Sequence, residues 1–313
     1  MNIHPTLASS VPAGADFGLR AISLSDEACF RAAIEAEQPQ SWLYYFPFLY
    51  CFAQRQRQTL LWEMVNSSIC IYMLTTSKAG KLLSLYVPPF PFEHAALEAA
   101  RGRVSRYNNK GGCRIVWAEE RFEQLLQSSG FESTLREEEF IYNTQLAISA
   151  EGKDFGRLRQ HLNRTRRLPE FSLSPFRADD GQACHELLDR WHDQLTDDKG
   201  VEVYGYHYVR TCLQNALSFG EGSLTGEVTR VDGQIAGFTF GGPIHSRMGS
   251  IFVSISDHTI DGLGYAQRHH FMSHFPELPY FNDSSDTGRE SLAHVKRQFR
   301  PVRMNRLLQA LDK

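Results

Sequence analysis

The stretch of residues 223–301 constrains the fold more than any other part of the chain. Two apolar runs, residues 224–231 and 234–241, flank Asp232 and Gly233, a dipeptide that favours a tight hairpin turn. The sequence then predicts a strand, a helix, a short strand and a second helix: residues 248–255, 264–275, 280–282 and 288–299. A hairpin followed by alternating helices and strands indicates an α+β domain rather than a purely parallel sheet.

The earlier part of the chain has a similar order of elements without a repeat of its residues. After a predicted helix over residues 25–37, strands over 68–75 and 81–87 flank a turn that contains Gly80. The predicted elements that follow are a helix, a strand, a helix and a strand: residues 93–107, 114–118, 120–128 and 139–147. A basic segment, a strand and two helices lead into the later series: residues 155–167, 171–176, 179–195 and 206–218.

This order predicts two tandem domains of the α+β class, each with a mixed sheet flanked by helices. We expect a flexible leader over residues 1–20, an N-terminal domain over 21–150 and a C-terminal catalytic domain over 151–313. The aromatic run over residues 42–50 is predicted to face the core, and a wall that contacts substrate is the alternative.

Composition limits the classes of partner and the compartment. The net charge of the 313-residue chain is -3, so any grip on nucleic acid must come from a local cluster of basic residues. The six cysteines are scattered without metal-binding spacing, which predicts reduced thiols and a cytoplasmic protein. No signal peptide and no integral membrane segment are expected.

Polar residues gather where the predicted strands of the later series end. Asp286 precedes the last helix, where it either caps the helix or assists in α-amine binding and base catalysis. Lys296 lies on that helix, as a solvated lysine or as a contact to a phosphate or oxyanion, and Arg300 follows one turn later. Asp257 is either a turn residue or a base on the acceptor side, and Asn282 ends the short strand.

Four segments resemble the catalytic domain of the phosphatidylglycerol lysyltransferases and their soluble relatives. They are residues 85–89, residues 139–142 with 152–163, the hairpin at 230–240, and a closing signature at 282–288 with Leu292, Lys296 and Pro301. The resemblance covers most of residues 60–305 and extends to the Fem peptidyltransferases. It implies a tandem acetyltransferase-like (GNAT) fold and transfer of an amino acid from aminoacyl-tRNA to a lipid, peptide or small-molecule acceptor, without a cofactor.

The resemblance also implies roles for individual residues. Asp286, Lys296 and Asp257 would be catalytic, and Asn282, Ser254, Ser284 and Arg300 would bind substrate. Acidic residues that the family usually carries are replaced by Ser254 and Ser284, which implies a rebuilt amino-acid pocket. Lysine as the transferred group is therefore doubtful, and the amino acid, the acceptor and the oligomeric state stay open.

The basic segment is the candidate contact to tRNA. Arg157, Arg159, Arg164 and Arg166 are distributed over two faces of the predicted helix. Distributed cations suit the phosphate backbone of an acceptor stem, and a solvated charged helix is the alternative interpretation.

Two other functions stay open at this point. Gly262 and Gly264 lie where acyl-CoA enzymes bind a pyrophosphate, although Thr259 replaces the usual basic or amide residue, so an acyl-CoA N-acyltransferase is the first alternative. A degenerate GNAT-fold binding module is the second. No acidic partner completes a zinc set such as HExxH with His258, His269, His270 and His274, so no metal site is predicted.

Overall fold

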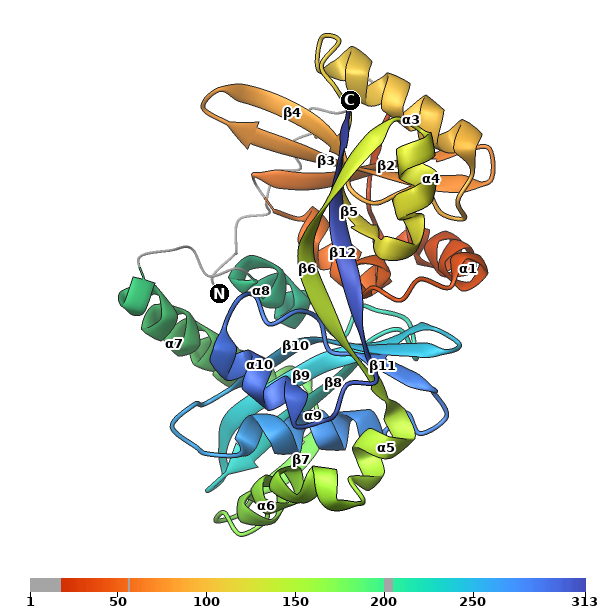
Figure 1. Ribbon diagram of the computed structural model, residues 1–313. Coiled ribbons are helices and arrows are strands. Elements are labelled where there is room, and N and C mark those ends of the chain that lie inside the picture. The colour runs from red at the N-terminus through yellow and green to blue at the C-terminus, as the bar shows by residue number, and fades with distance from the viewer. Residues whose placement is uncertain (1–17, 56, 200–204) are drawn as a thin grey trace, which may run out of the picture.

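A single twelve-stranded mixed sheet runs through the whole molecule (Figure 1). The computed structural model describes residues 18–55, 57–199 and 205–313, so nearly all of the predicted leader over residues 1–20 lies outside the described residues. The strands are ordered β1-β2-β3-β4-β5-β12-β6-β11-β10-β9-β8-β7. The predicted α+β class with mixed pairing and flanking helices is confirmed.

The elements follow the predicted order in both parts of the chain. The earlier elements are β1 (Arg20–Ala21), α1 (Glu27–Glu37), α2 (Phe46–Ala53), β2 (Gln58–Val65), β3 (Ser68–Ser77), β4 (Gly80–Leu85), α3 (His94–Tyr107), β5 (Arg114–Glu119), α4 (Glu123–Ser128), β6 (Phe131–Asn143) and α5 (Thr144–Ser149). The later elements are α6 (Gly156–Thr165), β7 (Ser172–Pro175), α7 (Gly181–Lys199), α8 (Tyr206–Asn215), β8 (Thr225–Val231), β9 (Gln234–His245), β10 (Met248–Ser256), α9 (Leu263–Ser273), β11 (Tyr280–Asn282), α10 (Glu290–Arg297) and β12 (Arg303–Asp312).

Two details of the predicted secondary structure were wrong. The strand predicted over residues 139–147 begins earlier and ends at Asn143, because the Asn143 side chain accepts a hydrogen bond from the Leu146 amide (3.0 Å) and caps helix α5. Strand β2 was missed, although its residues 60–62 are buried between β1 and β3. Each part of the chain therefore has four strands before its first crossover helix: β1 to β4 before α3, and β7 to β10 before α9.

Strands β6 and β12 run side by side from the earlier part of the sheet to the later part and connect the two (Figure 1). The last strand, β12, lies between β5 and β6 and pairs antiparallel with both. The final residues of the chain thus complete the sheet of the earlier part. The division into domains at residues 150 and 151 stays a prediction, and β12 crosses it in space.

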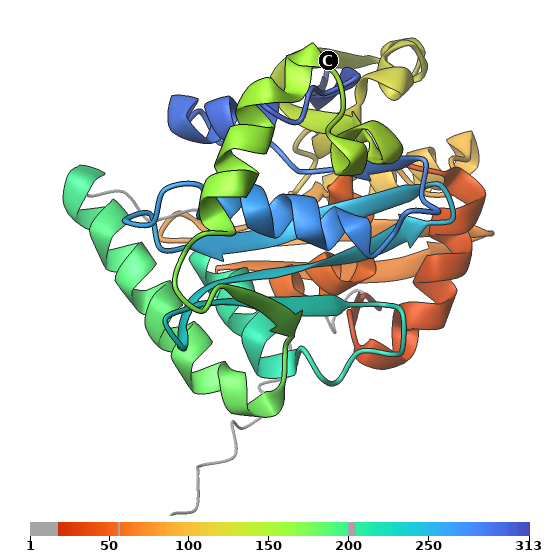
Figure 2. The same ribbon diagram turned by 90° about the horizontal axis from the view of Figure 1, so that it is seen from below.

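Helices cover both faces of the later part of the sheet. Helices α9 and α6 lie on one face, and α7 and α8 lie on the other (Figure 2). Helix α9 connects the parallel strands β10 and β11, as α3 connects the parallel strands β4 and β5. Within the described residues, no helix combines the length and apolar character that a membrane span requires.

The aromatic run over residues 42–50 is part of the main core. Tyr44 and Phe48 are fully buried, which confirms that the run faces the core. It forms a short 3-10 turn and helix α2 rather than an irregular connection, because Pro47 falls in the first turn of α2, where a missing amide hydrogen costs no helical bond.

Candidate active site

Strands β10 and β11 separate after the first three residues of β10 and leave an opening in the sheet. They pair in parallel only from Met248 to Ser250, although β10 continues to Ser256. The chain after β11 stays with β6 instead, because the Asp283 amide donates to the Phe140 carbonyl (3.0 Å). The edge of β10 after Ser250 therefore carries backbone groups without a neighbouring strand on that side, and such groups can bind a ligand.

A cavity of about 710 Å³ occupies this opening. Its wall is formed by the end of β10, the loop to α9, the first turns of α9, the segment after β11 and one side of α10. Trp191 on α7 and Tyr208 on α8 line it from the opposite face of the sheet, together with Trp42 of the aromatic run. A volume of this size is typical of small-molecule and cofactor sites.

A buried charged cluster forms the inner wall of the cavity. Asp283 accepts from the Nε of Arg268 (3.0 Å to Oδ2) and from the hydroxyl of Tyr142 (3.0 Å). The side chains of Arg268 and Asp283 are 8% and 2% exposed, so the pair is almost completely removed from water. Burying such a pair costs free energy unless its hydrogen bonds are complete, so a charged cluster at a cavity wall marks a candidate functional site.

Lys296 is the second cation of the cluster, and its ammonium is already saturated. The Nζ atom donates to the carbonyl of Asp283, to the carbonyl of Ser285 (2.8 Å) and to the hydroxyl of Ser284 (3.1 Å). An ammonium has three hydrogens, so these three partners use all of them. Burial lowers the pKa of Lys296 to about 8, although the nearby Asp283 carboxylate (3.8 Å) acts in the opposite direction. Lys296 therefore fixes the turn over residues 283–285 rather than presenting a free charge.

Arg268 has hydrogens left for a ligand. Its Nε serves Asp283 and its Nη1 donates to the Gly264 carbonyl (3.1 Å), whereas its Nη2 has no hydrogen-bond partner in the described part of the chain. Arg268 is thus a buried charged group of the cavity wall with unused donors.

Besides Lys296, three residues predicted from the sequence line the cavity: Ser254, Asp257 and Ser284. The hydroxyl oxygen of Ser254 is buried and has no hydrogen-bond partner among the described residues. Asp257 accepts from the amide (2.9 Å) and the hydroxyl (2.6 Å) of Thr259, as expected for the turn-residue interpretation. Burial tends to raise the pKa of Asp257, but these two hydrogen bonds outweigh it and leave the pKa below its usual range.

Three other predicted residues, Asn282, Arg300 and Asp286, lie outside the cavity wall. Asn282 is buried and donates to the carbonyl of Gln40 (2.8 Å) and the carboxylate of Glu139 (2.7 Å), which joins β11 to β6. Arg300 donates to the carbonyl of Asp154 (2.8 Å) and follows the end of α10, so it does not continue a helical face with Lys296.

Asp286 does not cap the last helix, which was the structural role predicted for it. Helix α10 begins at Glu290 with Arg289 in the capping position, because Asp286 instead accepts from the Gly288 amide (2.9 Å) in a turn of its own. Its carboxylate is close enough to favour the charged form of Lys296, but it lines a smaller hollow of about 420 Å³ on the other side of the turn. A catalytic role for Asp286 stays a prediction.

The four arginines predicted to contact tRNA all lie on the exposed surface of α6 or at its end. Arg159 donates to the carbonyls of Ala150 (2.6 Å) and Gly152 (2.7 Å), and Arg164 forms an ion pair with Asp261. Arg157 and Arg166 form no hydrogen bond or ion pair with any described residue. These two have guanidinium groups available for a phosphate backbone, whereas the other two also stabilise the local fold.

Two residues of the charged cluster were missed from the sequence. Arg268 lies in the middle of a helix, where an isolated arginine usually faces solvent. Asp283 stands between Asn282 and Ser284, inside the recognised closing signature, but Asp286 attracted attention as the apparent helix cap. The signal available was position, since Asp283 is the first residue after a buried strand.

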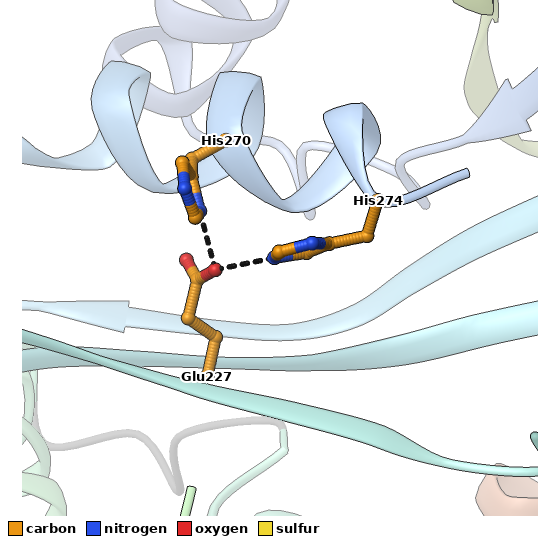
Figure 3. Close-up of side chains that lie close together, drawn as sticks. All are labelled: Glu227, His270 and His274. Atoms are coloured by element: carbon orange, nitrogen blue, oxygen red, sulfur yellow. Dashed lines mark hydrogen bonds and ion pairs between the residues drawn. The ribbon is translucent and has the colours of Figure 1, made fainter. Parts of the chain in front are cut away.

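An acidic partner for two histidines was also missed. Glu227 on β8 accepts from His270 on α9 and from His274 directly after it, at the end of that helix remote from the cavity (Figure 3). The sequence prediction considered only residues close along the chain, and strand pairing brings Glu227 to the helix from more than forty residues away.

Comparison with known proteins gives a family match and a shared fold. The sequence matches the family described as "Phosphatidylglycerol lysyltransferase, C-terminal" over residues 40–308. No curated protein sequence matches the chain significantly.

Three solved structures illustrate the shared fold. A conserved protein of unknown function from Bacteroides thetaiotaomicron VPI-5482 has a TM-score of 0.81 at 21% identity, with 94% of this chain and 99% of that chain covered. L-PGS from Bacillus licheniformis has a TM-score of 0.64 at 15% identity, with 92% of each chain covered. FemX has a TM-score of 0.66 at 8% identity, with 93% of this chain and 96% of that chain covered. The predicted tandem acetyltransferase-like fold is confirmed.

Proposed function

The chain belongs to the phosphatidylglycerol lysyltransferase C-terminal family, and on this premise we propose that it transfers an amino acid from aminoacyl-tRNA to a small-molecule, peptide or lipid acceptor. An amine or hydroxyl of the acceptor attacks the carbonyl carbon of the ester that joins the amino acid to the terminal ribose. The carbon–oxygen bond to the ribose breaks, and the proton lost by the nucleophile ends on the ribose oxygen. The product is an amide or an ester, and an aminoacyl-tRNA donor would place the reaction in the cytoplasm.

The opening between β10 and β11 is the observation that carries this proposal. It combines unpaired backbone groups on β10, a cavity of about 710 Å³ and a fixed positive group at the wall. The donor ester is already activated, so the protein must chiefly hold both substrates together and stabilise the oxyanion of the tetrahedral intermediate. Lining residues come from both faces of the sheet, so donor and acceptor can approach from opposite sides.

We assign the main electrostatic role to Arg268. Its Nη2 hydrogens are unused and it lines the cavity, so it can donate to the oxyanion or to the terminal phosphate of the donor. The sequence prediction gave this role to Lys296 and Arg300. In the proposal Lys296 becomes a positioning residue, because its three donors hold the turn over residues 283–285, and Asp283 orients both cations.

The remaining lining groups suit recognition of the two substrates. The unpartnered hydroxyl of Ser254 lies on β10 and can bind the α-amine or carbonyl of the amino acid. Asp257 keeps one carboxylate oxygen for the acceptor, and its lowered pKa keeps it ionised, which suits binding of a polar or cationic acceptor better than proton abstraction. Arg157 and Arg166 would contact the tRNA backbone beside the cavity, since α6 packs on α9.

The test is loss of label from a pool of aminoacyl-tRNAs charged with radioactive amino acids, incubated with a cell extract as the source of acceptors. The expected result is faster loss from at least one tRNA species with the wild-type chain than with a folded Arg268→Met variant. Label would appear in a product that survives the mild alkali that cleaves aminoacyl-tRNA, if the product is an amide. If every species loses label at the rate of the protein-free control, transfer from tRNA is refuted and a binding module without activity is the better interpretation.

An acyl-CoA N-acyltransferase is the second candidate, and one observation favours it. Gly262 and Gly264 lie at the first turn of α9 and line the cavity, so backbone amides at a helix N-terminus face the space where a pyrophosphate could bind. Saturable thermal stabilisation by acetyl-CoA, together with no response to aminoacyl-tRNA, would favour this candidate over the first.

A further inference from the structure

Three metal-ligating side chains converge at the end of α9 that is remote from the cavity. His270 and His274 lie four residues apart, on one face of the helix, and Glu227 reaches them from β8 (Figure 3). The Nδ1 of His270 lies 2.5 Å from the Oε2 of Glu227, and the Nε2 of His274 lies 2.8 Å from the same oxygen. None of the three lines the cavity, and His274 is about 15 Å along the helix from Gly264 at 1.5 Å per residue.

The carboxylate of Glu227 is buried and only half used. Its residue is 2% exposed, and its second oxygen, Oε1, has no hydrogen-bond partner among the described residues. A buried oxygen of this kind costs about 1–3 kcal/mol when nothing satisfies it. Both histidines form hydrogen bonds to the other oxygen, Oε2. The Glu227 carboxylate therefore has one unused oxygen and lies next to two ring nitrogens.

The two histidines keep the site accessible. Their side chains are each 41% exposed, whereas Glu227 lies beneath them at 3% exposure of its side chain. An ion can therefore enter from solvent and keep water in its remaining positions. The three ligand atoms already lie within 4.8 Å of one another, so small side-chain rotations are enough to surround an ion.

We propose that Glu227, His270 and His274 bind one divalent transition-metal ion, and that the ion is zinc. Two imidazoles and a carboxylate are a donor set that zinc accepts, with water as the fourth ligand. A histidine pair at positions i and i+4 of a helix presents both rings to one ion. The ring nitrogens that now donate to Glu227 lose those hydrogens to the other ring nitrogen or to solvent when they bind the metal.

The ion would tie the C-terminal end of α9 to β8. Because Arg268 lies less than one turn before His270 on the same helix, the clip would also hold the helix face that lines the cavity. The role is structural, since no cavity residue takes part. The proposal does not depend on the reaction assigned to the cavity.

The experiment uses the full chain without a histidine tag, treated with a chelator and dialysed. Isothermal titration with zinc chloride is expected to give one equivalent bound, and cobalt chloride is expected to give visible absorption of a low-symmetry site. His270→Gln and His274→Gln should each weaken zinc binding at least about tenfold, because even losing an indirect partner of a ligand costs that much. His94→Gln, at an exposed histidine on α3, is the matched control and should bind zinc as the wild type does.

Absence of stoichiometric zinc binding would overturn the proposal and leave a carboxylate hydrogen-bonded to two histidines. Equal zinc affinity in wild type and in the double variant His270→Gln with His274→Gln would overturn it as well, because the metal would then bind elsewhere. Both histidine side chains are partly exposed, so these variants should fold, and far-ultraviolet circular dichroism checks that they do.

Discussion

Helices α3 and α9 occupy the same place in the two parts of the chain, yet they bury different chemistry. Each connects two parallel strands of the sheet. The buried residues of α3 are all apolar: Ala96, Leu97, Ala100 and Val104. Helix α9 buries Gln267 and Arg268 among its apolar residues, and Arg268 meets Asp283 across the opening between β10 and β11. The same crossover therefore builds a plain core in one part and a charged cavity wall in the other.

The difference teaches that the site depends on compensation between buried charges. An apolar helix face needs only shape and volume to pack. Arg268 and Lys296 can remain buried only because Asp283 and the carbonyls of the following turn complete their hydrogen bonds. Variants that remove one member of the cluster should therefore behave differently from variants that remove an apolar contact of α3.

The largest effect is expected from Asp283→Ala. Loss of this carboxylate leaves Arg268 and Lys296 as buried cations without their acidic partner, which should lower the free energy of unfolding by about 3–5 kcal/mol. Urea unfolding followed by circular dichroism measures the change. Asp286→Ala is the matched control on the same segment and should shift stability by about 0.5 kcal/mol or less. Equal effects of the two variants would contradict the central place given to Asp283.

Two variants, one on α3 and one on α9, separate the effect on stability from the effect on activity. Leu97→Ala empties a fully buried site on α3 and should cost about 2–5 kcal/mol of stability, with transfer by the folded fraction unchanged. Arg268→Met keeps much of the side-chain volume but removes the cavity-facing donors, which should lower kcat about 100-fold to 1000-fold. Single-turnover transfer at a temperature where both variants are folded measures this. Transfer by Arg268→Met at the wild-type rate would remove Arg268 from the mechanism.

The third prediction concerns pH, which should change stability and activity in opposite directions. Burial lowers the pKa of Lys296 to about 8, well below the value of a lysine in the unfolded chain. Between those two pH values the unfolded chain binds the extra proton, so the contribution of this group to stability rises with pH across that window. Activity should fall as the pH rises through about 8, because neutral Lys296 has fewer hydrogens with which to hold the turn over residues 283–285.

Lys296→Met provides the check on this assignment. Its stability should lack the rise above about pH 8, and its residual activity should lack the alkaline fall. A wild-type pH profile that is retained in Lys296→Met would assign the titration to another group.

The smallest effect is expected at the surface of α6. The double variant Arg157→Gln with Arg166→Gln should weaken tRNA binding several-fold and reduce the salt dependence of the affinity by about 1 for each phosphate that the variant no longer neutralises. Filter binding at several salt concentrations measures the slope. Lys110→Gln, at an exposed cation in the earlier part of the chain, should leave the slope unchanged. An unchanged slope in the α6 variant would support the plain solvated-helix interpretation.

Local sequence patterns predicted some parts of the cavity and not others. The hairpin at Asp232 and Gly233, strand β10 and helix α9 followed from turn chemistry and periodicity, which act over a few residues. Asp257 was predicted from its place at a strand end, and Ser254 and Ser284 from the family resemblance, and all three line the cavity. Asp286 and Arg300 lie a short segment outside the predicted site. The start and end of α10 could not be predicted, because they depend on turns that several similar residues could form.

The sequence alone determined the class of fold, the order of elements and the resemblance to an acyl-transfer family, because these depend on patterns local to each segment. Only the tertiary structure decided which charges are buried. Arg268 and Asp283 are ordinary residues in the sequence and become a cavity wall because the chain after β11 leaves β10 and follows β6. Glu227 became a partner of His270 and His274 in the same way, through strand pairing between distant segments. Buried charges are compensated by contacts between distant segments of the sheet, so local sequence patterns cannot predict which charges are buried.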